Sequence, residues 1–553
     1  STMAMKLTGA WSRVAGVVAL LGPVACGGSS GSPDAQLEDA QLDAADGPAT
    51  VHVLAFNDLG GALTPSADGR GGVAYLAGEV ARRRTDHTVV VSAGDLIGAS
   101  PLISALFHDE PTIEAMNVMG LDLAAVGSHE FDEGTAELQR MQHGGCHPVD
   151  GCTPGQTFDG ASFQYLAANV VDTTTGEGIF PATALRTIDG VVVGFVGLAS
   201  EDTPATTLAS GIPELAFADE LETVQAVLPG LRDAGAQVIV VLVHAGGVHA
   251  GGPDDCDGLA GPIVTLATAL DGEVAMIVGG RTNDAYACRL GNVVVTSAGS
   301  AGQLLTDATL TIDRATGVVL AASLHNATVT TAKAPDAAVA AVVDHYDALV
   351  APRRDQVVAT ITTTIGTGQT LAGELPMGDV IADAMLEATA TSTGAQAALM
   401  NRGGVRAALT YAASPPEAVD GQVTYGEAFA VQPFSNLVST VTLSGADLAL
   451  ALDHWSATAP LQVAGLTYTW HASAAPGARV TPADIVLGGA AVEATQSYRV
   501  TVNSIVGDPG TTPSMAGATD TVGAGIDLDL LVSYLAAHSP VGLPDGPRIF
   551  QEP

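Results

Sequence analysis

The stretch AVGSHEFDEG, from Ala125 to Gly134, decides the fold because a short apolar run ends there in polar side chains. An apolar run of this length, bounded by Gly and Ser, predicts a buried strand. His129 follows the predicted strand directly. Three other apolar runs end in the same way, and the polar residues after them are Asp58, Asp95 and His244. Because ligands bind at the carboxyl ends of strands in open α/β architectures, we expect these side chains to form one site.

Strand-like and helix-like segments alternate through residues 50–330. Helical character is expected for Gly72–Arg84 and Asp219–Ala234. Continuous apolar strands with helices between them predict an α/β fold whose sheets are covered on both faces. The predicted strands are VHVLAF, HTVVVSAGD, LAAVGS, FQYLAANVV, VVVGFVGLAS, VIVVLVHAGG and AMIVGG.

A helical stretch then separates this part from a second domain. The segment 336–358 lacks Gly and has its one Pro near the end, so a linker helix is expected within 331–358. Residues 359–553 mix strand and helix patterns, which predicts a second domain of the α+β class. No internal repeat is visible.

Length and composition favour two globular domains. The chain has 553 residues, of which 47% are apolar and 14% charged. Its net charge of -39, with only two lysines, Lys6 and Lys333, argues against a nucleic-acid partner, because phosphate backbones need a basic face. Such acidity is typical of a soluble, extracellular surface.

The N-terminal segment predicts export. Lys6 and Arg13 precede the apolar run AGVVALLGPVAC, which is too short to span a bilayer. Small residues before Cys26 resemble a bacterial lipobox, so residues 1–26 are expected to be a lipoprotein signal peptide with Cys26 lipidated. The alternative is an ordinary signal peptide. Residues 27–49 are small and acidic and predict a flexible tether. The folded part is therefore expected at the cell envelope, in the periplasm or at the cell surface, with an N-terminal lipid as its only membrane contact.

Four further cysteines suggest two disulfides, as expected for an exported chain. Cys146 with Cys152 would close the loop CHPVDGC, and Cys256 with Cys288 would join two loops that follow separate strands. A zinc site made by Cys146, Cys152 and His147 is the alternative for the first pair.

Several motifs resemble the bacterial secreted 5′-nucleotidases, which are related to periplasmic UDP-sugar hydrolase and 2′,3′-cyclic nucleotide phosphodiesterase. The motifs are FNDLGGAL, VVSAGDLIGASPLISALFHDEPTIEAMN, AVGSHEFDEG, GGCHPVDGC, VLVHAGG, GGRTNDAYAC, NRGGVR and PFSNLV. The resemblance implies a calcineurin-like metallophosphoesterase β-sandwich with flanking helices (αββα), followed by an α+β 5′-nucleotidase C-terminal domain. In that family two metals hydrolyse nucleotide phosphomonoesters, and the second domain binds the nucleoside and rotates to deliver the phosphate.

The resemblance also implies where the metal ligands should lie. Asp58, the bridging Asp95 and His244 are kept, as are the catalytic His129 and its partner Asp132. The family's other ligand positions carry substitutions: its His, Asn, His and His are replaced by Gly60, Ser128, Arg281 and Asn283.

These substitutions predict a damaged metal centre. A two-metal site needs ligands on both ions, and here the cofactor is expected to be one weakly held divalent ion (Mn, Zn or Co) or none. Arg281 places a fixed positive charge near the second metal position. We expect it to pair with Asp95 and replace the metal structurally.

In the second domain, Asn401, Gly403, Arg406 and Phe434 match the family's substrate contacts, with the aromatic ring stacking on a base. Ile505 replaces the family's second aromatic residue, and Thr511 stands near an expected Asp. The base sandwich is therefore expected to be lost.

Three functions stay open on the sequence. The first is an exported 5′-nucleotidase relative with reduced or lost hydrolysis that keeps a binding or surface role. The second is a single-metal phosphoesterase that uses Asp58, Asp95 and His244, with His129 as acid. The third is a metal-free module in which Arg281, His129 and Arg406 hold a nucleotide or another phosphate-bearing small molecule.

Overall fold

The computed structural model describes residues 47–153, 156–207, 211–434 and 436–553. The predicted signal peptide, Cys26 and nearly all of the predicted tether lie outside the described residues. The first strand, β1, begins at Ala49, one residue before the expected start of the first domain. Among the described helices, none is both long and apolar enough to cross a membrane.

The first domain contains two six-stranded sheets. In one, the order is β14-β13-β1-β2-β3-β4, and in the other it is β11-β12-β10-β9-β7-β6. The strands β1 to β4 run parallel to one another, and so do β7, β9, β10 and β12. The first sheet has β14 (Val319–Thr328), β13 (Leu304–Ile312), β1 (Ala49–Phe56), β2 (Thr88–Ser92), β3 (Leu123–Ala125) and β4 (Gln164–Leu166). The second has β11 (Ala285–Leu290), β12 (Val293–Ala298), β10 (Met276–Gly279), β9 (Val238–Val243), β7 (Val191–Leu198) and β6 (Thr183–Ile188).

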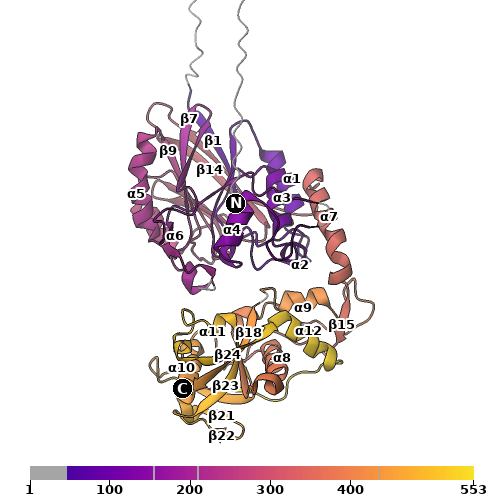
Figure 1. The fold of residues 1–553 in the computed structure, drawn as a ribbon. Helices are drawn as coiled ribbons and strands as arrows, with labels where there is room; N and C mark the ends of the chain where they lie inside the picture. Colours follow the sequence, from indigo (N-terminus) through magenta and orange to yellow (C-terminus); the bar gives the residue numbers. More distant parts are fainter. Residues whose placement is uncertain (1–46, 154–155, 208–210, 435) are drawn as a thin grey trace, which may run out of the picture. The chain divides into compact units, whose positions relative to one another are not determined.

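The sheets pack face to face, and helices cover their outer faces. One core joins the inner faces, with Val53 of β1 and Val240 of β9 both fully buried in it. The outer face of the first sheet packs on α1 and α3, and that of the second on α5 and α6, so the strands lie between two helical layers (Figure 1). These helices are α1 (Val73–Arg83), α3 (Glu110–Met119), α5 (Glu220–Asp233) and α6 (Pro262–Ala269). The predicted αββα sandwich is confirmed.

The sequence prediction found the strands that carry the site, and in one case it merged two strands into one. FQYLAANVV forms two strands, β4 and β5 (Val170–Asp172), and β5 pairs with β8 (Leu215–Phe217) outside the main sheets. Between them, the Asn169 amide donates to the carbonyls of Ala199 and Ala218 and accepts the N–H of Ala199. These side-chain hydrogen bonds take the place of backbone hydrogen bonds between strands. The chain therefore leaves the first sheet between β4 and β5.

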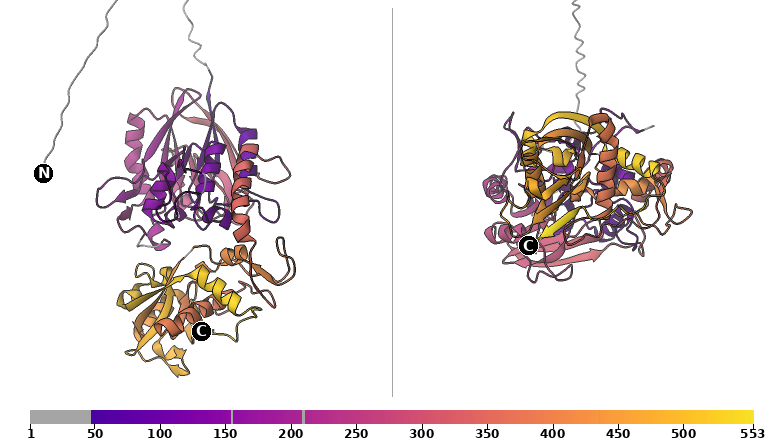
Figure 2. Two further views of the ribbon diagram at one scale, coloured as in Figure 1. Left: turned by 45° about the vertical axis from the view of Figure 1, so that its right-hand side comes forward. Right: turned by 90° about the horizontal axis from the view of Figure 1, so that it is seen from below.

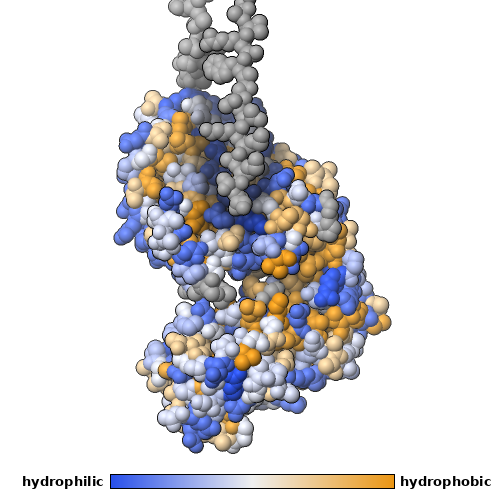
Figure 3. Space-filling view, viewed as in Figure 1, coloured by the Kyte–Doolittle hydropathy of each residue, from blue (hydrophilic) through white to orange (hydrophobic). Residues whose placement is uncertain are grey.

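The predicted linker helix is α7 (Ala337–Arg354), which is shorter than the expected 336–358. The Asp336 carboxylate caps it by accepting the N–H groups of Ala338 and Val339. The strand β15 (Val357–Thr360) begins soon after the helix ends. On the face drawn in Figure 3, apolar residues gather around α7, α9 (Tyr425–Val431) and α12 (Asp527–Ala537), and the rest mixes polar and apolar residues.

The second domain is α+β, as predicted. Its main sheet has the order β19-β16-β23-β18-β24. A smaller sheet has the order β22-β21-β20-β25, in which β21 is Ile485–Leu487 and β22 is Ala490–Ala491. The last strand, β25 (Ile549–Glu552), runs parallel to β20 (Leu466–His471) and is the yellow strand at the C mark in Figure 2. The main sheet packs on α8 (Pro376–Thr393) and α10 (Gly445–Ser456). Its strands are β19 (Gln462–Ala464), β16 (Ala397–Met400), β23 (Ser497–Asn503), β18 (Leu437–Ser444) and β24 (Thr519–Ile526).

Candidate active site

Asp58, Asp95 and His244 meet at the carboxyl ends of β1, β2 and β9. One ligand atom from each lies within 4.8 Å of the others, and all three side chains are buried. The parallel strands explain the meeting, because their carboxyl ends share one edge of each sheet. Three residues that are far apart in sequence thus form one cluster, at the place where the sequence predicted it.

His244 and Asp95 form a buried pair. Nε2 of His244 lies 3.0 Å from Oδ2 of Asp95, and Nδ1 lies 3.0 Å from the carbonyl of Ala93. Burial lowers the pKa of His244, but the hydrogen bond and charge of Asp95, together with the charges of Asp58 and Glu130, outweigh burial and raise that pKa to about 9. Burial likewise raises the pKa of Asp95, yet the nearby charge of His244 lowers it to about 2. At neutral pH the pair is therefore charged on both partners.

Asp58 is held from two sides. The amide of Asn57 donates to Oδ2 at 2.7 Å, and the backbone N–H of Arg281 donates to both carboxylate oxygens at 2.9 and 3.0 Å. Burial raises the pKa of Asp58 to about 6, and the negative charge of Asp95 adds to the rise, while His244 opposes it. Asn57 also accepts the N–H of Ala298, so one amide ties the loop after β1 to β12.

The backbone lies in the left-handed region at five of the expected ligand positions, whereas Ser128 is right-handed with φ -76°. The φ angles are 49° at Asp58, 48° at Asp95, 73° at Arg281 and 56° at Asn283, and Gly60 has 52°. Such conformations cost non-glycine residues about 1–3 kcal/mol each, and they cluster at functional sites. The loops around Asp58 and Asp95 therefore hold a backbone conformation that is costly for non-glycine residues.

Arg281 does not pair with Asp95, and that expectation was wrong. Its guanidinium Nη2 lies 2.8 and 2.9 Å from the two carboxylate oxygens of Asp202, in the segment after β7. The physical reason is charge balance, since His244 already neutralises Asp95, and the half-exposed Asp202 carboxylate is within reach. Arg281 thus donates its backbone N–H to Asp58 and directs its side chain elsewhere.

Neither Gly60 nor Ser128 offers a strong metal ligand. A side chain at Gly60 would have its Cβ 3.9 Å from the carbonyl of Gly98, with nothing closer. Ser128 is buried, and its carbonyl accepts the hydroxyl of Thr207.

His129 and Asp132 form the expected pair. Nδ1 of His129 lies 2.8 Å from Oδ2 of Asp132, which also accepts the N–H of Ala99. The backbone N–H of His129 donates to Oδ1 of Asp95 at 2.8 Å. Burial lowers the pKa of His129, but Asp132 and Asp95 outweigh it and raise the pKa to about 9. The imidazolium is thereby placed next to the carboxylate cluster as a proton donor.

Sequence reasoning missed Glu130. This buried carboxylate accepts the N–H groups of Asp95, Leu96 and Gly127, so it joins the loops after β2 and β3. Burial raises its pKa to about 8, helped by the charge of Asp95. Its place directly after His129 was the available signal, but the neighbouring Asp132 and Glu133 made it inconspicuous.

The expected substrate contacts of the second domain share one cavity of about 510 Å³. Asn503 donates to Oδ1 of Asn401 at 2.8 Å, and the guanidinium of Arg406 lies 5.5 Å from the ring centroid of Phe434. His129 and Asp132 line the same cavity. Its lining thus contains Asn401, Gly403, Arg406 and Phe434 together with the His129 pair.

The cavity also contains an aromatic residue that sequence reasoning missed. Trp455 of α10 lines it beside the expected Ile505 and Thr511. The indole Nε1 donates to the hydroxyl of Thr512 at 3.0 Å. The loss of an aromatic residue at Ile505 therefore does not leave Phe434 as the only aromatic side chain of the pocket. No spacing in the sequence linked a residue of this helix to the cavity.

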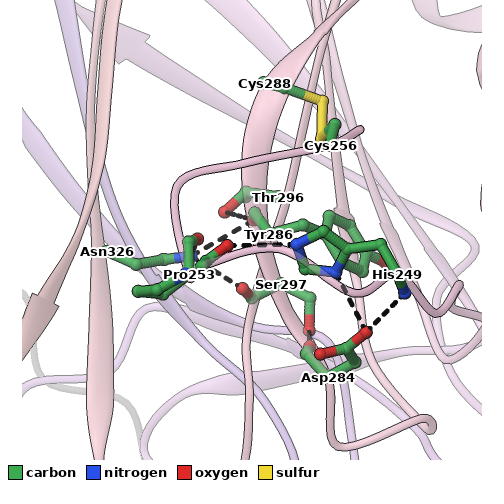
Figure 4. The surroundings of a disulfide bond; sticks show 10 residues. His249, Pro253, Cys256, Asp284, Tyr286, Cys288, Thr296, Ser297 and Asn326 are labelled. Carbon is green, nitrogen blue, oxygen red and sulfur yellow. Dashed lines mark hydrogen bonds and ion pairs between the residues drawn. A yellow bond between two sulfur atoms is a disulfide. The ribbon is translucent and has the colours of Figure 1, made fainter. Parts of the chain in front are cut away.

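Both predicted disulfides are present, Cys146–Cys152 and Cys256–Cys288. The zinc alternative with Cys146 and Cys152 is therefore set aside. Around the second disulfide, His249 contacts Asp284, and the amide of Asn326 donates to three backbone carbonyls (Figure 4). This network holds the segment that follows His244 against β11 and β12.

Comparison with known proteins agrees with this architecture. Residues 357–516 match the family model of the 5′-nucleotidase C-terminal domain. The chain is 29% identical to the endonuclease YhcR of Bacillus subtilis over 82% of its length, and 30% identical to the cell wall protein Lmo0130 of Listeria monocytogenes, also over 82%. It spans only 37% of the first relative and 63% of the second.

Among solved structures, the 5′-nucleotidase precursor from Thermus thermophilus superposes with a TM-score of 0.72 at 25% identity. The superposition covers 91% of this chain and 100% of that one. The chain thus carries a 5′-nucleotidase C-terminal domain, and its two-domain fold is similar to that of a 5′-nucleotidase over nearly all of its described length.

Proposed function

We propose that this chain is a 5′-nucleotidase relative that binds nucleotide-like phosphate compounds and hydrolyses them slowly or not at all. The observation that carries this proposal is the arrangement at Arg281, which donates its backbone N–H to Asp58 and gives its side chain to Asp202. Two-metal hydrolysis needs ligands that clamp both ions. Ser128 and Arg281 supply no strong donor to the second ion, and Gly60 supplies none to the first.

The remaining donors fit one divalent ion. Asp58, Asp95 and His244 offer two carboxylates and an imidazole, a set that suits Mn, Zn or Co. Nε2 of His244 is buried and makes no hydrogen bond of good geometry, although it faces Asp95 at 3.0 Å. A bound ion would satisfy that nitrogen and would polarise a phosphoryl oxygen. A single-metal phosphoesterase is therefore the second candidate function.

Binding is supported by the cavity in the second domain. Phe434 and Trp455 offer aromatic surface to a base, and Arg406 offers a guanidinium to phosphate oxygens. His129 lines the same cavity. Burial lowers its pKa, but Asp132 and Asp95 raise it by more, to about 9, so His129 is cationic at neutral pH. These groups can hold an anionic nucleotide without any metal.

We also propose that the protein is exported and lipid-anchored through Cys26. Support comes from the lipobox-like sequence, the two disulfides and the relative that is named a cell wall protein. In cells treated with globomycin, which blocks cleavage of lipoprotein signal peptides, the uncleaved precursor of this protein should accumulate. A Cys26→Ala chain that is processed like the unchanged protein would contradict lipidation.

The test of the main proposal compares phosphate release from AMP with AMP affinity. The protein is assayed with Mn, Co and Zn, beside a variant that carries Gly60→His, Ser128→Asn, Arg281→His and Asn283→His. We expect AMP binding by both proteins and rapid hydrolysis only by the variant. Rapid hydrolysis by the unchanged protein that is lost in His244→Ala would support the single-metal candidate instead.

A further inference from the structure

A second group of potential metal ligands lies away from the Asp58 cluster. His108 follows α2 (Leu102–Ala105), while His147 and Asp150 belong to the loop after α4 (Thr135–His143). One ligand atom from each lies within 4.8 Å of the others. The disulfide Cys146–Cys152 closes the loop that carries His147 and Asp150, which restricts where these two side chains can go.

Both imidazoles approach the same carboxylate oxygen. Nε2 of His108 lies 2.9 Å from Oδ2 of Asp150, and Nδ1 of His147 lies 3.5 Å from that oxygen. The two rings stack with their centroids 3.7 Å apart and an interplanar angle of 11°. Two neutral imidazole nitrogens and one carboxylate oxygen are the donors of three-ligand zinc sites, in which a water completes the tetrahedron.

The other nitrogen of His108 has the partner that a metal-binding histidine usually has. Nδ1 lies 2.9 Å from Oε2 of Glu133. Ligating histidines almost always donate their second ring N–H to a carboxylate or a carbonyl, which fixes the tautomer and makes the ligating nitrogen more basic. Without metal, Nε2 of His108 faces the carboxylate of Asp150 at 2.9 Å, so an ion would bind Nε2 in place of the proton shared with Asp150, while Nδ1–H stays with Glu133.

We propose that His108, His147 and Asp150 form a divalent-metal site of the zinc class, with Glu133 orienting His108. Nδ1 of His147 accepts the backbone N–H of Asp150 at 3.1 Å, and a metal would bind the same lone pair in place of that hydrogen bond. The imidazole side chains are 21% and 14% exposed and the Asp150 side chain is 65% exposed, so an ion enters from solvent. This site uses no cysteine, unlike the one considered from the sequence.

The location suggests what the ion would do. His108 and Glu133 line a cavity of about 290 Å³ together with His129 and Asp132. An ion at His108 would fasten the disulfide loop to the wall of this cavity. It would order one wall of the cavity that His129 and Asp132 also line.

The test measures metal binding by the full chain in a background that lacks the first cluster. Asp95→Asn with His244→Asn removes the Asp58 cluster as a competitor, and bound metal is stripped with a chelator before Zn²⁺ or Co²⁺ is titrated. We expect about one ion per chain and the visible absorption of four-coordinate Co²⁺. Glu133→Gln, which removes no ligand, should weaken binding about 10–100-fold.

The decisive comparison uses two variants. One combines His108→Asn with His147→Asn, and the control carries His143→Asn alone, at an exposed histidine on the neighbouring helix. The proposal requires the first variant to lose the Co²⁺ spectrum and the second to keep it. Circular dichroism of the metal-free proteins shows whether each variant is folded. If the folded first variant still binds one ion with the same spectrum, or if the background protein binds none, the proposal is overturned.

Discussion

The guanidinium of Arg281 lies 2.8 Å from the carboxylate of Asp202, while the backbone N–H of the same residue donates to Asp58. The backbone of this residue thus lies at an expected metal-ligand position, while its side chain forms an ion pair with Asp202. Because the pair involves a half-exposed carboxylate, it contributes little to stability. The replacement of the expected histidine by Arg281 matters chemically, because the second metal position is then without an imidazole.

Restoring four side chains should therefore restore catalysis. The variant Gly60→His, Ser128→Asn, Arg281→His and Asn283→His is expected to raise kcat/KM for AMP by about 10²-fold or more with Mn or Co, because developing charge is then neutralised by two ions. Phosphate release under saturating metal measures this. Arg281→His alone serves as the matched control and should give a small gain. Equal activity of the fourfold variant and the parent would argue against a damaged metal centre.

Removing His244 should destabilise the fold. His244→Ala leaves the buried carboxylate of Asp95 without its counter-charge, which costs about 3–5 kcal/mol in the free energy of unfolding. Urea unfolding followed by circular dichroism, with chelator present, gives this number. His325→Ala, at an exposed pair with Asp254, should change stability by less than about 1 kcal/mol. Similar losses in both variants would contradict a buried ion pair at Asp95.

The free energy of unfolding should fall as pH rises from about 6.5 to about 9. Burial lowers the pKa values of His129 and His244, but their carboxylate partners raise both to about 9. The folded chain then binds more protons than the unfolded chain in this window, so the stabilisation present below pH 6.5 is lost through pH 9. Burial of Glu130 raises its pKa to about 8, which acts in the same direction.

Urea titrations at several pH values, without metal, measure the slope of this loss. His129→Asn removes one of the titrating groups and should make the slope shallower. A free energy of unfolding that stays constant or increases between pH 6.5 and pH 9 would show that these histidines do not hold their protons in the folded chain.

Nucleotide binding should be visible in Trp455 fluorescence. Trp455 lines the cavity beside Phe434, whereas Trp470 is buried elsewhere with its indole bonded to the carbonyl of Ala372. Stacking of a base should quench the emission, and Trp455→Ala should weaken AMP binding by about 1–3 kcal/mol, as for other aromatic contacts to bases. Trp470→Phe is the matched control and should leave the quenching intact. Quenching that survives in Trp455→Ala would place the base elsewhere.

The disulfide Cys256–Cys288 should matter for stability. The bond spans 32 residues, so Cys256→Ser with Cys288→Ser should lower the free energy of unfolding by about 2–4 kcal/mol. Cys146→Ser with Cys152→Ser opens a span of only 6 residues and should cost less in the absence of metal. Denaturant curves of the two double variants make the comparison. The reverse order would contradict a chain-entropy origin.

Sequence alone predicted the scaffold well because the relevant signals are local. Each apolar run before Asp58, Asp95 and His244 is a complete strand, and parallel strands bring their ends together. Side-chain partners were harder to predict. Nothing near Arg281 in the chain points to Asp202, and the expected Arg281–Asp95 pair was wrong because His244 already neutralises that carboxylate.

Contacts between distant segments were missed for the same reason. Trp455 reaches the cavity from a helix. His108 stacks on His147, which belongs to the loop closed by a disulfide, and this contact exists only in the folded chain. The sequence FQYLAANVV predicts one strand. The segment forms two because the amide of Asn169 bonds to residues that are remote in sequence. Periodicity carries no information about such pairs.

The left-handed backbone at Asp58, Asp95, Arg281 and Asn283 has a practical consequence for protein design. Loops are the most difficult part of an artificial metal centre to build, and here they are already in place around an adaptable set of side chains. New ligands need only side-chain changes on a folded host. The same chain could thus be turned toward metals and reactions that its own family does not use.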